Sequence, residues 1–295
     1  LVAMSKGTAD QIACERFEHP ATIALLLGIS AGAGPIDDDG NAAAYMIFAV
    51  THKYGTGKPI GSLQSFSDAL ARSIEASGAM IELNAPVAEI IIDEGTAKGV
   101  RLQDGRVIRA KMVIATCDPR TAMRLTTPGG LPRTLTQRIE HAPANRSNAA
   151  PFLANLALSG PLTLKKHQDM RHDDADLNKA VGLIGTPDEV RNAFALARRG
   201  DIPERHAVSL TPLSNSDPTQ APPGGSLAYV YLPGVAVDAR EGWSPALKDR
   251  TMESIKSHLS EFYDGLDAEV GRFVETARER EKRLNVTNGC VTHVD

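Results

Sequence analysis

Apolar residues between positions 63 and 78 recur at helical spacing. Leu63, Phe66, Leu70 and Ile74 are separated by three, four and four positions, which places them on one face of a helix. Gly78 follows where a left-handed C-terminal cap is favoured. The pattern therefore predicts an amphipathic helix that ends at Gly78.

After Gly78 the pattern changes from helical to strand-like. Four short runs predict a first strand and then a three-strand antiparallel meander: 80–83, 87–91, 99–102 and 107–108. Asp93-Glu94-Gly95 is a turn sequence. Asp104-Gly105 is the favoured dipeptide of a tight hairpin, in which both central positions need a positive φ.

Residues 111–116 form a continuous apolar run, which is typical of a strand buried on both faces of a sheet. The run ends in Ala115-Thr116-Cys117, immediately before Asp118-Pro119. Ligands in doubly wound sheets bind at the carboxyl ends of the strands. The order of helix, strand, meander and buried strand therefore predicts half of a nucleotide-binding α/β layer.

The flanking regions predict a second architecture. Residues 1–58 are helical and rich in small residues, and 21–36 predicts a buried helix followed by a loop. A later helix begins at Ser244 as N-cap with Pro245 in its first turn, and is expected to end at Gly265. Strand-like runs occupy 153–158, 207–210 and 227–232. The predicted fold class is therefore α/β plus α+β, with a mixed sheet in the second part.

Composition excludes several classes of protein. The 295 residues include 32 Lys+Arg and 36 Asp+Glu, a formal net charge of −4, so there is no electrostatic footprint for nucleic acid. Aromatic residues are scarce (Phe 7, Tyr 5, Trp 1), so the core is expected to be aliphatic. The apolar stretch 21–36 is too short to span a membrane. Peripheral membrane contact stays open, although no basic amphipathic helix is evident to support it.

The positions of the cysteine, histidine and acidic residues do not predict a metal site. Three cysteines far apart in sequence (Cys14, Cys117, Cys290) indicate neither a disulfide framework nor a zinc site, and they fit a reducing, cytoplasmic compartment. The acidic stretch with His167 and His172, which includes Asp173, Asp174 and Asp176, is interpreted as a solvated loop. The mixed-charge run 275–283 is interpreted as a solvated helix face or tether.

Four stretches resemble the phytoene-dehydrogenase-like FAD-dependent oxidoreductases, which include the carotenoid desaturases and the relatives called pyridine nucleotide-disulphide oxidoreductase domain-containing protein 2. They are Pro59-Ile60-Gly61-Ser62 with the helix to Gly78; 100–105 with 113–119; 187–200 with Asp217-Pro218-Thr219-Gln220-Ala221-Pro222-Pro223-Gly224; and Asn288-Gly289-Cys290-Val291-Thr292-His293. The third stretch is the most specific. The resemblance covers residues from about 59 to the end.

The resemblance implies a partial FAD/NAD(P)-binding flavoprotein fold and an interior fragment of a longer enzyme, because no GxGxxG occurs in these 295 residues. The expected domains are a helical part of the substrate domain at 1–58, a partial FAD-binding domain at 59–120, the substrate domain at 121–287, and a return toward the FAD domain at 288–295.

Individual roles also follow from the resemblance. Val87 corresponds to a strand position whose backbone contacts the adenine of FAD, and Ala115, Thr116 and Cys117 end a strand near the dinucleotide. His293 is placed close to the flavin and the substrate pocket. Without the resemblance, the simpler interpretation is a β-branched core residue for Val87, a small buried apolar residue for Cys117, and an exposed or hydrogen-bonded loop residue for His293. No catalytic residue is assigned.

The leading hypothesis is an FAD-dependent oxidoreductase that transfers hydride from a small lipophilic substrate to flavin. A flavin amine oxidase is a second hypothesis, for which an aromatic cage beside the flavin would be diagnostic. A catalytically silent interaction module of the same fold is a third. The isolated chain is expected to be inactive and to bind FAD weakly, because the pyrophosphate needs the glycine amides of a GxGxxG loop. The oligomeric state is left open.

Overall fold

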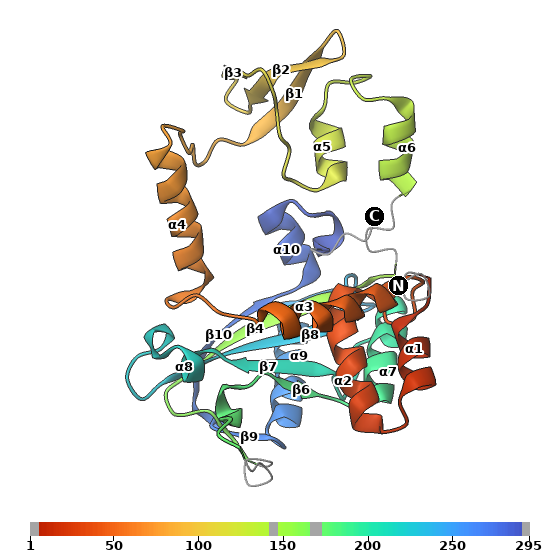
Figure 1. Cartoon of the computed structure of the whole chain (residues 1–295), viewed down its shortest axis with the longest axis vertical. Helices are drawn as coiled ribbons and strands as arrows, with labels where there is room; N and C mark the ends of the chain where they lie inside the picture. The colour runs from red at the N-terminus through yellow and green to blue at the C-terminus, as the bar shows by residue number, and fades with distance from the viewer. Residues whose placement is uncertain (1–5, 142–146, 166–172, 291–295) are drawn as a thin grey trace. The chain divides into compact units, whose positions relative to one another are not determined.

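A computed structural model describes residues 6–141, 147–165 and 173–290 (Figure 1). The chain divides into two compact units, and each is considered by itself. The first unit comprises Leu1–Ser65 and Asn145–Glu279, and the second comprises Phe66–Ala144 and Arg280–Asp295.

A five-stranded sheet forms the centre of the first unit, in the order β10-β4-β8-β7-β6. Its strands are β10 (Glu269–Glu275), β4 (Ala149–Leu158), β8 (Ser226–Ala236), β7 (Val208–Pro212) and β6 (Gly182–Ile184). Every described pairing in it is antiparallel, whereas a mixed sheet was expected. The loop from β7 to β8 contains α8 (Leu213–Ser216) and η5 (Pro218–Gln220), and it returns the chain as an antiparallel neighbour.

Helix α9 (Pro245–Leu259) packs its apolar side into the main core of this unit. Ser244 caps it as predicted, because the Ser244 hydroxyl accepts the Leu247 N–H at 3.1 Å. The predicted end at Gly265 is wrong. The helix ends at Leu259. The chain then forms β9 (Tyr263–Asp264), which pairs with β5 (Thr163–Leu164), so the residues just before Gly265 are in a strand.

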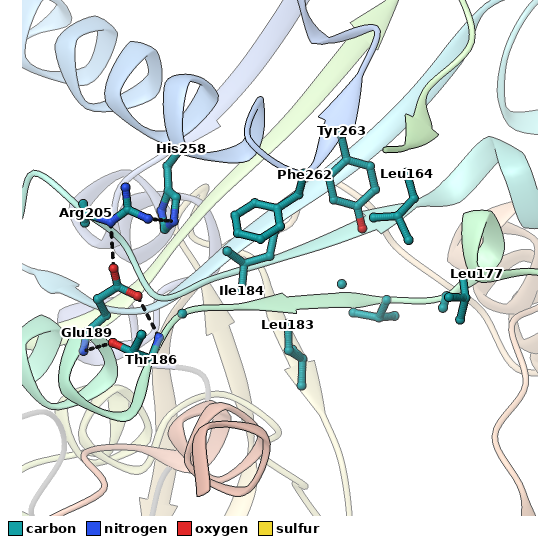
Figure 2. Close-up of a pocket in the computed structure, with 14 residues that line it drawn as sticks. Leu164, Leu177, Leu183, Ile184, Thr186, Glu189, Arg205, His258, Phe262 and Tyr263 are labelled. Atoms are coloured by element: carbon teal, nitrogen blue, oxygen red, sulfur yellow. Dashed lines mark hydrogen bonds and ion pairs between the residues drawn. The ribbon is translucent and has the colours of Figure 1, made fainter. Parts of the chain in front are cut away.

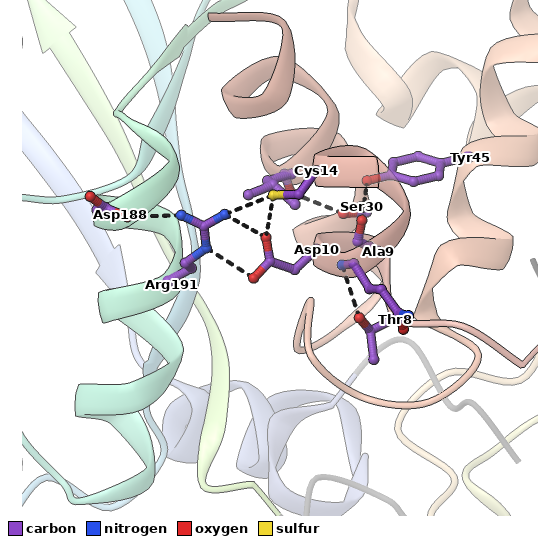
Figure 3. Close-up of polar contacts among 10 residues, drawn as sticks. Thr8, Ala9, Asp10, Cys14, Ser30, Tyr45, Asp188 and Arg191 are labelled. Carbon is purple, nitrogen blue, oxygen red and sulfur yellow. Dashed lines mark hydrogen bonds and ion pairs between the residues drawn. The ribbon is translucent and has the colours of Figure 1, made fainter. Parts of the chain in front are cut away.

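The helices predicted for the N-terminal region are present: α1 (Ala9–Arg16), α2 (Pro20–Ser30) and α3 (Met46–Tyr54), with short 3-10 turns η1 (Ala31–Ala33) and η2 (Asn41–Tyr45). Helices α1 and α2 lie beside α7 (Pro187–Arg198) (Figure 1). The Arg191 guanidinium of α7 binds the Asp10 carboxylate at 2.7 and 2.9 Å, and the Tyr45 hydroxyl donates to the Ala9 carbonyl at 2.9 Å (Figure 3). The Arg191–Asp10 ion pair fixes α1 against α7, and the Tyr45–Ala9 hydrogen bond fixes η2 against α1.

The second unit contains the predicted meander, as β1 (Val87–Asp93), β2 (Thr96–Leu102) and β3 (Val107–Arg109). Helix α4 (Ser62–Ala76) precedes it, with Gly78 left-handed at φ 81° as predicted. Helices α5 (Pro119–Leu125) and α6 (Arg133–His141) and the 3-10 turn η7 (Thr287–Gly289) also lie in this unit, and α10 (Ala277–Leu284) enters it at Arg280. At the Asp104-Gly105 turn only Gly105 has a positive φ, of 89°. The Leu102 carbonyl accepts the Gly105 N–H at 3.0 Å, which is the geometry of a three-residue hairpin and not the predicted two-residue one.

Two predicted strands are absent. Residues 80–83 and 111–116 are irregular, and their apolar side chains other than Val113 are exposed, with Met112 74% and Ile114 78% exposed. A strand needs a neighbour for its backbone hydrogen bonds. Among the described residues, no strand pairs with residues 111–116, and the sheet of the second unit ends at β3. The prediction of a strand buried on both faces is therefore wrong for the described residues.

The apolar face of α4 is also exposed, since Leu63, Phe66, Leu70 and Ile74 each expose between 42% and 73% of their surface. None of the helices in the described ranges combines the length and the apolar character that crossing a bilayer would need.

The main core predicts a large difference between two leucine truncations in the first unit. Leu156 of β4 is fully buried against α9, whereas Leu25 of α2 is 46% exposed. We expect Leu156→Ala to lower the free energy of unfolding by about 2–5 kcal/mol, because it leaves a cavity. Leu25→Ala is the matched control and should change it by less than about 0.5 kcal/mol. Equal losses in chemical denaturation would contradict this core assignment.

Buried His206 predicts a pH-dependent stability. Burial, followed by the nearby His258, lowers the pKa of His206 to about 4, from an ordinary value of 6.5. The unfolded chain therefore binds the proton more readily, and stability should fall by about 2 kcal/mol from pH 7 to pH 5. The His206→Gln variant, measured by denaturation across the same range, should show a clearly shallower slope. An unchanged slope would rule out this histidine as the source.

Candidate functional site

The four predicted cofactor residues lie in the second unit. Val87 begins β1 and is half-buried, whereas Ala115 and Thr116 are exposed and Cys117 is half-buried in the segment before α5. The structure brings β1 beside the segment that follows α5, because the Ile90 carbonyl accepts the Thr127 N–H at 3.1 Å. His293 lies outside the described residues.

Asp118, in the second of the stretches that carried the family resemblance, binds the loop that leads into the fourth. Its carboxylate caps α5 by accepting the Arg120 N–H at 3.0 Å. The same carboxylate accepts the Thr287 N–H at 2.7 Å and the Thr287 hydroxyl proton. One turn further along α5, the Thr121 hydroxyl donates to the Asn285 carbonyl at 3.1 Å. Asp118 is 5% exposed, so a buried charge holds residues 285–287 against the segment that ends at Cys117.

Helix α10 holds the rest of this loop. The Arg280 guanidinium donates to the Gly289 carbonyl at 3.0 Å, and the Glu281 carboxylate accepts the Asn288 N–H at 3.0 Å. Asn288 and Gly289 have left-handed φ values of 55° and 65°, a conformation that both residue types tolerate. Arg280 is 1% exposed, so the interpretation of 275–283 as a solvated face is wrong at this residue. Its guanidinium is buried where it donates to this backbone carbonyl.

Asp217 makes the equivalent connection in the first unit. Its carboxylate accepts the Gly61 N–H at 2.7 Å and the hydroxyl proton of Thr219 at 2.6 Å. These hydrogen bonds, from Thr219 first and then from Gly61, lower the pKa of Asp217 to about 2. The first and third stretches of the resemblance, at the start of α4 and in the β7–β8 loop, are therefore joined directly. Both motifs were recognised in the sequence, but the role of Asp217 in joining them was not predicted.

The five-stranded sheet has one face in the core and one half-exposed face. The partners across the ladder define two rows on the half-exposed face: Phe273, Asn155, Tyr229 and Thr211, and then Glu275, Leu153, Tyr231, Ser209 and Leu183. Tyr229 and Tyr231 are neighbours along β8, with ring centroids 6.5 Å apart and ring planes tilted by 40°. Phe273 is 55% exposed at the β10 edge. We call these two rows the open face.

A cavity of about 200 Å³ lies between α2 with η1 and this part of the sheet. Its walls include Gly28 and Gly32 on one side and Leu183, Ser209 and Tyr231 of the open face on the other. A Cβ added at Gly32 would lie 3.9 Å from the Tyr231 hydroxyl, so small residues on the helix side keep the cavity open. The cavity is mostly apolar, as small-molecule sites are.

The residues present could bind only part of a dinucleotide cofactor. The meander and the segment at 115–117 are in place, but the sequence supplies no GxGxxG loop whose amides would hold a pyrophosphate. Among the described residues, no three His, Cys, Asp or Glu side chains are grouped so that they could hold a metal ion. No catalytic acid or base stands out on the open face.

Comparison with protein families gives one match, to the model for flavin containing amine oxidoreductase, over residues 6–280. The mouse protein called pyridine nucleotide-disulfide oxidoreductase domain-containing protein 2 is 27% identical over 248 residues, which covers 79% of this chain and 41% of that protein. A 4,4'-diapophytoene desaturase from Methylomonas sp. is 28% identical over 199 residues, covering 67% of this chain and 36% of the desaturase. The chain thus spans about two fifths of the length of these relatives.

Among solved structures, a variant of putrescine oxidase aligns with a TM-score of 0.59 at 15% identity, over 95% of this chain and 55% of the oxidase. At this identity the likeness concerns the fold alone. Together with the family match it confirms the expected flavoprotein fold.

The Asp118 connection predicts a local change in backbone protection. Asp118→Asn keeps a side-chain oxygen to cap α5 but replaces the oxygen facing Thr287 with an N–H donor. We expect the Thr287 amide to exchange its hydrogen about tenfold faster or more, while the α5 amides keep their protection. Hydrogen exchange read by NMR measures both, and Asp104→Asn in the exposed hairpin is the control. Unchanged exchange at Thr287 would show that the carboxylate does not hold the loop.

Proposed function

The chain belongs to the flavin-containing amine oxidoreductase family, and from that premise we propose that it contributes to an FAD-dependent oxidoreductase of the phytoene-dehydrogenase-like type. Its substrate would be an elongated lipophilic molecule that loses a hydride. The proposal draws on the carotenoid desaturase among the relatives. It rests mainly on one observation, the character of the open face.

The open face suits a lipophilic substrate. Its half-exposed positions are aliphatic, aromatic or uncharged polar, with Leu153, Tyr229 and Phe273 as the larger side chains. The carboxylate of Glu275, at the end of one row, is 2% exposed. An uncharged surface of this kind binds by removing apolar area from water and costs no desolvation of charge.

In this proposal the protein binds and orients, and a bound flavin would supply the capacity to accept a hydride. The open face would hold the substrate and exclude water from it. Asp118 and Arg280 would keep the 285–290 loop in one conformation, and Asp217 would fix the start of α4. These are positioning roles, and none of the three side chains is assigned a proton transfer.

Tyr229 and Tyr231 favour a second candidate, a flavin amine oxidase. Two tyrosine rings side by side on a half-exposed face can stabilise a substrate ammonium through their electron-rich surfaces. Trp243 does not add to such a cage, because its ring stacks on Phe152 at 5.7 Å and its N–H donates to the Ala236 carbonyl. The third candidate, a silent interaction module, differs from both in needing no flavin.

We also propose a cytoplasmic location, since Cys14, Cys117 and Cys290 form no disulfide with one another. We propose that nucleic acid is not a partner, because the net charge is −4. Peripheral membrane contact would be compatible with a lipophilic substrate, and the exposed apolar face of α4 is a surface that could provide it.

Anaerobic flavin bleaching separates the three candidates. The protein encoded by the longest open reading frame should copurify with FAD and lose the flavin absorption band when a polyene or isoprenoid substrate is added. Bleaching by primary amines, with KM raised in Tyr229→Leu and Tyr231→Leu, would instead support the amine oxidase. Failure of that protein to retain flavin would contradict both enzymes and leave the interaction module.

The 295-residue chain alone should hold FAD poorly. It has no GxGxxG loop, and Met112, Ile114 and the α4 face are exposed where a complete nucleotide-binding layer would bury such residues. Titration with FAD, followed by flavin fluorescence, should give no stoichiometric complex at micromolar concentrations. A purified yellow chain with one flavin per molecule would overturn this expectation.

A further inference from the structure

A second cavity of the first unit, of about 450 Å³, has no role in the proposed function (Figure 2). It lies along β6, between this strand and the residues that follow α9. Its walls are formed by Leu164, Leu177, Ala180, Val181, Gly182, Leu183, Ile184, Gly185, Thr186, Glu189, Arg205, His258, Phe262 and Tyr263. The volume is that of a typical small-molecule pocket, and most of the lining is apolar.

One polar group faces the apolar part of this pocket. Tyr263 follows α9, and Figure 2 shows its hydroxyl pointing toward β6. A Cβ at Gly182 would lie only 2.3 Å from that hydroxyl oxygen, so the glycine makes room for it. Burial raises the pKa of Tyr263, which keeps the hydroxyl protonated and able to donate.

The opposite end of the pocket carries a small charge cluster. The Arg205 guanidinium binds the Glu189 carboxylate at 2.8 Å and the Glu261 carboxylate at 2.8 Å. It also donates to His258 at 2.9 Å, and Glu189 accepts the Thr186 N–H at 2.7 Å. Burial first, and then Arg205, lowers the pKa of His258, so this imidazole is neutral at pH 7.

This cluster has a net charge of −1 at pH 7, since one guanidinium faces two carboxylates. The donors of Arg205 are largely engaged by its three partners. An anionic ligand would therefore meet repulsion and find little unpaired positive charge. An extended peptide is also a poor occupant, because β6 is only three residues long and short edge strands are poor templates for pairing.

We propose that this pocket binds an uncharged, mainly apolar small molecule whose single hydroxyl or carbonyl oxygen hydrogen-bonds to the Tyr263 hydroxyl. Its apolar body lies between Leu164, Ile184 and Phe262 along β6. The charge cluster of Arg205, Glu189 and Glu261 selects against acids of the same shape. This binding needs no flavin, so it stands or falls separately from the proposed oxidoreductase activity.

Two fluorescent probes with the same ring skeleton test the charge preference on the 295-residue chain. N-phenyl-1-naphthylamine is uncharged, and 1-anilinonaphthalene-8-sulfonate adds a sulfonate. Ala180→Trp narrows the pocket from an exposed wall position, and Val270→Trp, at a 69% exposed position of β10 that does not line the pocket, is the matched control. Val181→Trp, also at an exposed wall position, repeats the test if the first variant folds poorly.

We expect the uncharged probe to bind the chain at this pocket with an affinity that Ala180→Trp lowers by about tenfold or more and that Val270→Trp leaves unchanged. The sulfonate probe should bind that same site more weakly. Equal effects of the two tryptophan variants, or tighter binding of the sulfonate at the Ala180-sensitive site, would overturn the proposal.

Competition by 1-octanol tests the hydrogen bond. Octanol should displace the uncharged probe. Tyr263→Phe should lower the affinity for octanol by about two- to tenfold, because one neutral hydrogen bond is lost. Octane is the control, and its displacement of the probe should be the same in both proteins. Octanol affinity unchanged by Tyr263→Phe would remove Tyr263 from the site.

Discussion

Buried carboxylates that accept backbone N–H groups from distant segments are the constraint on which the rest of this structure depends. Asp118 binds Thr287 across 169 positions of sequence, and Asp217 binds Gly61 across 156. Each connection replaces water at a backbone donor with a charged acceptor, which is among the stronger hydrogen bonds a protein makes. Each also closes a long loop, and the entropy of closure grows only slowly with its length. Two side chains can therefore fix the places where distant stretches meet.

These two connections bring together stretches of the family resemblance that are separate in sequence. Asp217 lies in the third stretch and accepts from Gly61 in the first, and Asp118 lies in the second and accepts from Thr287, the residue before the fourth. Asp118 caps α5 and reaches the loop after α10, while Asp217 organises the β7–β8 loop and reaches the start of α4. A residue that only accepts a hydrogen bond from a distant segment produces no periodic pattern in the sequence. Its partner can be identified only in the folded structure.

Local signals were predicted well and non-local ones poorly. The spacing from Leu63 to Gly78, the Ser244-Pro245 start of α9 and the alternation of the meander gave correct elements, because their determinants lie within a few residues. The expected strand at 111–116 was wrong, because strand formation depends on a neighbour that no local pattern specifies. Arg280 was assigned to solvent for the same reason, since its contact with the Gly289 carbonyl is made only in the folded chain. The open face and both cavities required the register of the sheet, which the sequence alone did not provide.

The alternation along β8 has a consequence for how this protein can change. Residues 228, 230 and 232 face the core, and residues 227, 229 and 231 face away from it. Because the period is two, an inserted or deleted codon within the strand would exchange these two sets beyond that point and send Tyr229 or Tyr231 into the core. Substitution can therefore adjust the two faces separately, whereas length variation is confined to the loops at either end of β8. Ligand preference on this sheet would diverge among relatives by replacement of alternate residues at constant strand length.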